Sequence, residues 1–268
     1  YRGHCAIGSR KVCGGRAAAL AQSQATCGNV YPLKLELKSK VGARLHAGRL
    51  VSEKDRRPFA MKKIMSAAEN LFCAGYLLFA FAAGFIFLSR GGTLFSRCAV
   101  MTFLLAGGDV FHLVPRVISN LNPEWAGKKF WLGLGNIVSS VTMALFYVAL
   151  AYVMDSYQPG LMPPAVPVVL IVLSAVRICL CASPSNNWFE DGGDQKWRLY
   201  RNVPFLGIGL ITVLYLAAFY RQWLLAALVA VSFACYMVTV MGVKKNPRLG
   251  MLMIPKTICY IWIIAFFL

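Results

Sequence analysis

Residues 203–242 read VPFLGIGLITVLYLAAFYRQWLLAALVAVSFACYMVTVMG, and this apolar run decides the fold. The run is about twice as long as one membrane crossing requires, since a hydrocarbon core of about 30 Å takes about 20 residues at 1.5 Å per residue. Arg221 and Gln222 follow Tyr220 near its middle and supply a polar break. The stretch therefore predicts two antiparallel transmembrane helices that are joined by a hairpin at Tyr220–Gln222.

Apolar runs of similar length fill most of the remaining chain. Together with 203–220 and 222–242, the runs that we expect to cross a membrane are 71–89, 99–115, 130–153, 164–183 and 250–268. Hydrophobic residues make up 58% of the chain and the mean hydropathy is +0.60, values far above those of a soluble domain. The sequence therefore predicts an all-α membrane protein, a bundle of seven transmembrane helices within residues 61–268.

The charges near the helix ends predict the orientation of this bundle. If the N-terminus is cytoplasmic, the inner side carries Lys62, Lys63, Arg116, Lys128, Lys129, Lys196, Arg198, Arg201, Lys244, Lys245 and Arg248. The outer side then carries Arg90, Arg97 and Arg221. Because cytoplasmic loops are enriched in Lys and Arg, this distribution predicts a cytoplasmic N-terminus and an external C-terminus. If the short run 99–115 did not cross the membrane, loops rich in Lys and Arg would no longer alternate with loops poor in them.

Residues 1–60 differ in character from the rest of the chain. They hold 12 Lys/Arg against 3 Asp/Glu, contain no Met and show no sustained helical or strand period. Met61-Lys62-Lys63 then reads like a bacterial start before an apolar helix, which favours the plasma membrane of a bacterium. We interpret 1–60 as a basic, disordered leader that is not part of the true protein. The alternative is a basic arm that binds anionic lipid or nucleic acid.

A few polar residues lie inside the apolar runs, namely Asp109, His112, Asn136, Arg177 and Lys256. A charge in hydrocarbon costs several kcal/mol, so such residues are candidates for a functional site. In the orientation given above, counting 1.5 Å per residue from the inner helix ends puts all of them but His112 roughly 10 Å deep. Tyr236 falls at a similar level. We therefore expect one polar layer in the cytoplasmic half of the bundle.

The sign of this layer indicates its ligand. Asp109 is a single acid among several cations, and such an excess favours a phosphate, a carboxylate or a lipid head group. The residues that we expect to bind the ligand are Asn136, Arg177, Lys256, Arg116, Arg201 and Tyr236. The loop Ser183–Tyr200 is expected to cap the pocket. The expected partners are membrane lipids and a small anion, with no nucleic acid.

Two other functions fit the same residues. Asp109, His112 and Arg116 follow i, i+3, i+7 spacing and share one helix face, so Asp109 and His112 are the catalytic candidates if the protein is a lipid-acting hydrolase. In the third interpretation, Asp109 pairs with Arg177 or Lys256 and only holds a structural or sensory bundle together. His112 is the only histidine in 61–268, so we expect neither a zinc site nor another cofactor.

Two family resemblances rest on short motifs. Residues 108–116, GDVFHLVPR, and 253–257, MIPKT, resemble an uncharacterised family of bacterial seven-helix membrane proteins, which implies topology alone for residues 61–268. Gly108-Asp109 followed by Gly133-Leu134-Gly135 is similar to the YhhN/lysoplasmalogenase family of lipid-cleaving membrane enzymes. That second resemblance implies two intramembrane acids. Only Asp109 matches, because residues 231–235 read VSFAC, so His112 would have to act as its partner.

Overall fold

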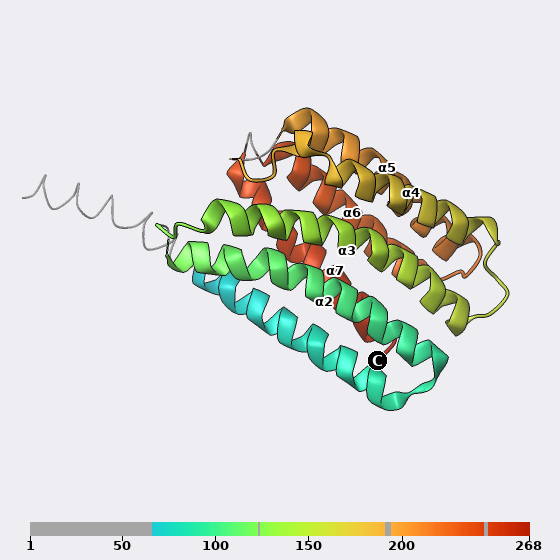
Figure 1. Ribbon diagram of the computed structural model, residues 1–268. Coiled ribbons are helices and arrows are strands. Elements are labelled where there is room, and N and C mark those ends of the chain that lie inside the picture. The colour runs from blue at the N-terminus through green and yellow to red at the C-terminus, as the bar shows by residue number, and fades with distance from the viewer. Residues whose placement is uncertain (1–65, 123, 191–193, 244–245) are drawn as a thin grey trace, which may run out of the picture. The chain divides into compact units, whose positions relative to one another are not determined.

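The computed structural model describes residues 66–122, 124–190, 194–243 and 246–268, so the expectations for residues 1–60 lie outside the described part. Every regular element among the described residues is a helix, and seven helices there are long and apolar enough to cross a membrane. The predicted all-α bundle is thereby confirmed. Figure 1 shows the helices side by side with nearly parallel axes.

In chain order the elements are the first helix Ser66–Arg90, α2 Gly92–Leu121, α3 Lys128–Tyr157, α4 Ala165–Ala182, the 3-10 turn η1 Pro184–Asn186, α5 Gln195–Ala218, α6 Trp223–Gly242, the 3-10 turn η2 Pro247–Leu252 and α7 Met253–Phe266. From α2 to α7, each helix packs against the next in the chain. The chain therefore runs up and down through the bundle, as short connections between neighbouring helices require.

The turns have identifiable causes. Gly91 and Gly92 have φ of 67° and 82°, a region that a residue without a Cβ adopts at little cost, and they reverse the chain before α2. Asp194 caps α5, because its Oδ1 accepts hydrogen bonds from the backbone N–H groups of Lys196 and Trp197 at 2.7 and 3.0 Å. The predicted hairpin between α5 and α6 is confirmed, with Arg221 at a φ of 53°.

The helices α2 and α5 extend furthest beyond the expected membrane runs. The run 99–115 belongs to α2, which begins at Gly92 and ends at Leu121, and the run 203–220 belongs to α5, which begins at Gln195. The added turns of α5 are mostly polar, and those of α2 mix polar and charged residues with apolar ones, so hydropathy alone does not reveal them. The helix α2 also continues through Gly107 and Gly108 without a break.

The helices α2 and α3 approach each other closely where the polar candidates lie. A Cβ built on Gly135 of α3 would collide with the backbone oxygen of Phe111 in α2, and one on Gly108 would collide with the side chain of Thr142. Small residues permit this approach, as they do in many membrane bundles. The contact fixes the position of Asp109 and His112, which flank Phe111 on α2.

Gly135→Ala is expected to destabilise the bundle by about 1–3 kcal/mol, because the obstructing atom belongs to the backbone of α2 and cannot rotate away. The midpoint of thermal unfolding in detergent measures this effect, with unfolding detected as the loss of monodisperse protein. Gly107→Ala is the matched control, since a Cβ there meets nothing within 4 Å. Equal midpoints for the two variants would contradict the close approach.

Candidate functional site

Asp109 joins α2 to the first helix. Its Oδ2 accepts a hydrogen bond from the Tyr76 hydroxyl at 2.7 Å. The carboxylate is partly buried, and Tyr76 is only 2% exposed. A hydrogen bond from a buried phenol stabilises a carboxylate in apolar surroundings. Asp109 thus has a fixed orientation inside the bundle.

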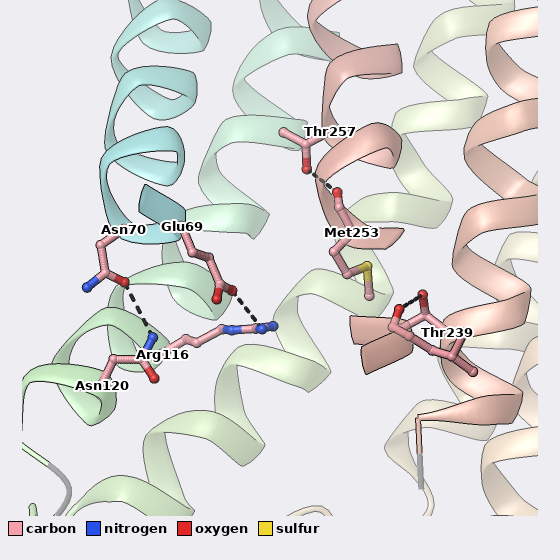
Figure 2. Close-up of polar contacts among 8 residues, drawn as sticks. Glu69, Asn70, Arg116, Asn120, Thr239, Met253 and Thr257 are labelled. Atoms are coloured by element: carbon pink, nitrogen blue, oxygen red, sulfur yellow. Dashed lines mark hydrogen bonds and ion pairs between the residues drawn. The ribbon is translucent and has the colours of Figure 1, made fainter. Parts of the chain in front are cut away.

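Arg116 makes the second link between the same helices, two turns further along α2. Its Nη2 lies 2.7 Å from Glu69 Oε1, and both side chains are about one-third exposed, at 36% and 31%. Figure 2 shows this ion pair beside a hydrogen bond from Asn120 to Asn70. Arg116 therefore has its own acid, and it lies nearer the helix ends than Asp109 does.

His112 lies between these two links on α2. Its Nδ1 is buried and has no hydrogen-bond partner among the described residues. The imidazole lies beside the side chain of Asn136 on α3. Asn136 is exposed in the structure, whereas the sequence predicted that it belongs to a buried polar layer. Depth along a helix does not determine which face a residue occupies. Within the described part of the chain, no hydrogen bond connects His112 with Asp109.

Lys256 is buried near the start of α7. Its Nζ lies 5.1 Å from the ring centroid of Tyr236 and 5.3 Å from that of Tyr260, both within the range of a cation–π contact. The ammonium also interacts electrostatically with Asp109. Of the described carboxylates, none lies within the 4 Å of an ion pair with Lys256. The ammonium thus faces aromatic rings with a single acid nearby.

The hydroxyl of Thr239 on α6 sets the start of α7. Its single O–H lies within hydrogen-bond distance of the carbonyls of Cys235 and Leu249, at 2.8 and 3.1 Å, and the contact with Leu249 ties α6 to the 3-10 turn η2. This connection holds the first turns of α7, and with them Lys256, against α6.

Arg177 on α4 is the most deeply buried cation of the described part, at 1% exposure. Its Nε donates to the Ser140 carbonyl at 3.1 Å, and its Nη1 donates to Asn202 Oδ1 at 3.3 Å and to the Arg201 carbonyl at 3.4 Å. The guanidinium stacks on Phe205 at 3.6 Å from the ring centroid. All these partners are neutral, so they satisfy three of the five N–H donors and do not compensate the charge.

Asn202 connects the two buried cations. Its Oδ1 accepts from Arg177 and also from the Tyr236 hydroxyl at 3.0 Å, while its Nδ2 donates to the Arg198 carbonyl at 2.8 Å. Tyr236 in turn lies beneath the ammonium of Lys256. We name Asp109, Arg177, Asn202, Tyr236 and Lys256 the polar layer. Residues from α2, α4, α5, α6 and α7 meet in it.

The side chain of Arg201 is held by the loop after α4. Its Nη1 donates to Asn186 Oδ1 at 2.8 Å, and its guanidinium stacks on Trp188 at 3.9 Å from the centroid. Asn186 and Trp188 in turn donate to the carbonyls of Leu180 and Cys181 at 2.7 and 2.9 Å. The loop after α4 therefore satisfies the last carbonyls of that helix, which have no partner within it. Its predicted role as a pocket cap stays a prediction.

A groove of about 550 Å³ lies on the outer face of α4. Apolar side chains such as Val172 and Val176 line most of it, with Trp197 at one end. None of the predicted site residues lines this groove. A groove of this kind suits an acyl chain of the surrounding lipid and has no place in the chemistry of the polar layer.

The sequence did not point to three of the residues that hold the site, namely Glu69, Tyr76 and Asn202. A signal for the first two exists, because Glu69 and Tyr76 have the same spacing as Asp109 and Arg116. In antiparallel neighbours that spacing lets two pairs form together. Asn202 lies just before the apolar run 203–220, so it is not one of the polar residues inside the runs.

Comparison of the chain with protein-family models, with curated proteins and with solved structures finds no match. Within the described ranges, no three His, Cys, Asp or Glu side chains gather in a way that could hold a metal ion. Both family resemblances therefore stay predictions, and the polar layer has to be interpreted from its own chemistry.

Arg177→Lys is expected to lower the stability of the bundle by about 1–3 kcal/mol, because an ammonium cannot reach Ser140 and Asn202 together and loses at least one buried, charge-assisted hydrogen bond. The midpoint of thermal unfolding in detergent measures the loss. Arg221→Lys is the control, since Arg221 is exposed in the turn between α5 and α6. A lysine that is tolerated equally at both positions would refute the role given to the guanidinium.

Proposed function

We propose that this multi-pass membrane protein binds a small anionic group at the polar layer. The observation that carries the proposal is the buried ammonium of Lys256, which has no described carboxylate at ion-pair distance and lies against the rings of Tyr236 and Tyr260. A charge in this position costs several kcal/mol unless a counter-ion is close. A phosphate, a carboxylate or the head group of a lipid would supply the missing charge.

The charge balance of the layer supports an anion over a cation. Arg177 keeps its positive charge among neutral acceptors, and Lys256 adds a second positive charge. Asp109 is the acid that opposes them, and its carboxylate already accepts a hydrogen bond from Tyr76. Two cations against one acid leave a positive site.

His112 supplies a further polar group at the same place. Its Nδ1 is buried without a hydrogen-bond partner among the described residues, and the ring interacts electrostatically with Lys256. An anionic ligand between α2 and α7 would therefore contact an ammonium and an imidazole. Hydrogen bonds that involve a charged group are about twice as strong as neutral ones, which favours a compact oxyanion.

The distribution of Lys and Arg supports a position for the layer in the cytoplasmic half of the membrane. Arg116 and Lys128 lie at the end of the bundle that is nearer the layer, and Arg90, Arg97 and Arg221 lie at the other end. The positive-inside rule then gives a cytoplasmic N-terminus. A bacterial plasma membrane is the setting that we propose, with the ligand entering from the cytoplasm.

Lys256→Met is expected to weaken anion binding at least tenfold, or about 1.4 kcal/mol, because it removes the ammonium and keeps an unbranched apolar side chain. Two probes distinguish the sources of the anion. Inorganic phosphate tests a soluble ligand by thermal stabilisation of the detergent-solubilised chain. Phosphatidylglycerol against phosphatidylcholine in nanodiscs tests a lipid head group by native mass spectrometry.

Lys196→Met is the matched control, because Lys196 is exposed at the start of α5 and lies outside the polar layer. It should bind both probes as the unchanged chain does. Loss of phosphate stabilisation alone in Lys256→Met would identify a soluble anion, and loss of phosphatidylglycerol alone would identify a lipid. Wild-type affinity of Lys256→Met for both probes, or no binding of either probe by the unchanged chain, would refute the proposal.

A further inference from the structure

A line of buried phenols extends from the polar layer towards the opposite end of the bundle. It consists of Tyr260 on α7, Tyr147 on α3, Tyr215 on α5 and Tyr220 in the turn between α5 and α6. Each of the four side chains is at most 3% exposed. Anion binding at the polar layer requires none of them except the ring of Tyr260, so the line needs an explanation of its own.

The line begins at Asp109 and Lys256. The Tyr260 ring centroid lies 5.3 Å from Lys256 Nζ, and the Tyr260 hydroxyl interacts electrostatically with Asp109. One helical turn deeper, the hydroxyls of Tyr260 and Tyr147 are 3.3 Å apart, within hydrogen-bond distance. Asp109 and Lys256, the titratable groups of the polar layer, thus lie next to the hydroxyl pair of Tyr260 and Tyr147.

The middle of the line lies among α3, α5 and α6. The Ser232 hydroxyl lies beside those of Tyr147 and Tyr260, but it has no hydrogen bond of good geometry among the described residues. The Tyr215 hydroxyl on α5 has Tyr147 as an electrostatic neighbour, and it is likewise buried without a hydrogen-bond partner among the described residues. Thr212 lies beside Tyr215 on the same helix. Buried hydroxyls therefore recur through the core of the bundle, and direct contact is made only between Tyr147 and Tyr260 among those described.

The line ends at the surface. The rings of Tyr215 and Tyr220 are 6.0 Å apart, and the Tyr220 hydroxyl, again without a partner in the described part, interacts with Asp155. Asp155 pairs with Arg97 at 3.8 Å, and its side chain is 40% exposed. Burial and the nearby Asp155 carboxylate raise the pKa of Tyr220 to about 12, so its phenol keeps its proton at neutral pH.

Unpartnered buried hydroxyls indicate where water belongs. Native proteins leave very few buried polar groups without a partner, and ordered water satisfies those that the protein does not reach. Ser232, Tyr215 and Tyr220 are three such groups along one line. Water that bridges them would make the hydroxyls continuous from Lys256 to Asp155.

We propose that this hydrated line of hydroxyls conducts protons between Asp109 with Lys256 at one end and Asp155 at the other. Each hydroxyl oxygen or water accepts a proton from the preceding group and releases its own proton to the next, so one O–H bond forms for each one that breaks. The terminal carboxylates take up and release the proton. No oxidant or reductant is needed, and the hydroxyls return by rotation.

Conduction along this line does not require an anion, so it stands apart from the proposed function. The two share Asp109 and Lys256, but the phenols beyond Tyr260 belong to the line alone. Variants of Tyr147 and Tyr215 therefore test conduction, and the binding of phosphate to the same variants tests whether the polar layer is intact.

The experiment uses the full chain in liposomes that contain a pH-sensitive dye, with an inside-negative potassium diffusion potential set by valinomycin. The initial rate of internal acidification is measured with and without inorganic phosphate on both sides. The unchanged chain should acidify the lumen faster than protein-free liposomes do. Tyr147→Phe and Tyr215→Phe should reduce this protein-dependent rate at least tenfold, because each keeps the ring and removes one hydroxyl.

Tyr200→Phe on α5 is the matched control, since this tyrosine is exposed and lies away from the line. It should retain the full rate. The thermal midpoint of each variant shows whether it is folded, and a variant that fails to fold is replaced by Tyr220→Phe. A rate equal to that of empty liposomes for the unchanged chain under both conditions, or a full rate in the folded phenylalanine variants, would overturn the proposal.

Discussion

A guanidinium that is removed from water must find several acceptors at once, and Arg177 finds them on two other helices. The Ser140 carbonyl and the Asn202 amide lie on α3 and α5, while Phe205 covers the face of the cation. Satisfying these donors fixes the rotation of three helices about their axes. Because Asn202 also accepts from Tyr236, the constraint extends to α6 and, through the Tyr236 ring, to the ammonium of Lys256.

Hydropathy and loop charge predicted the seven helices and the hairpin at Tyr220, because the length and the polarity of each run are properties of the local sequence. Asp109, Arg177 and Lys256 stood out for the same reason, since charges are rare in such runs. Their partners did not, because partnership depends on how neighbouring helices rotate and slide. Tyr76 reaches Asp109 only in one antiparallel register. Asn136 has a suitable depth, yet it lies on an exposed face.

The helix ends were harder to predict than the helix centres. The loop Ser183–Tyr200 is rich in polar residues, which the sequence alone interprets as a lid over a pocket. In the structure, Asn186 and Trp188 satisfy the last carbonyls of α4, and Arg201 holds both side chains in place. The backbone of a helix end requires such partners whether or not a ligand binds. The composition of the loop cannot show whether it caps a helix end or covers a ligand pocket, because both roles use the same residue types.

Lys256 stands where the two proposals meet. A buried lysine can reduce the cost of its charge by releasing its proton or by holding an anion beside it, and these choices exclude each other at any moment. An anion at the polar layer would favour the protonated lysine, and a protonated lysine would favour the anion by the same factor, since coupling between two binding equilibria is reciprocal. Asp109 and the Tyr260 ring are neighbours of this ammonium. Occupation of the anion site would therefore change the protonation of the group at which the line of phenols begins.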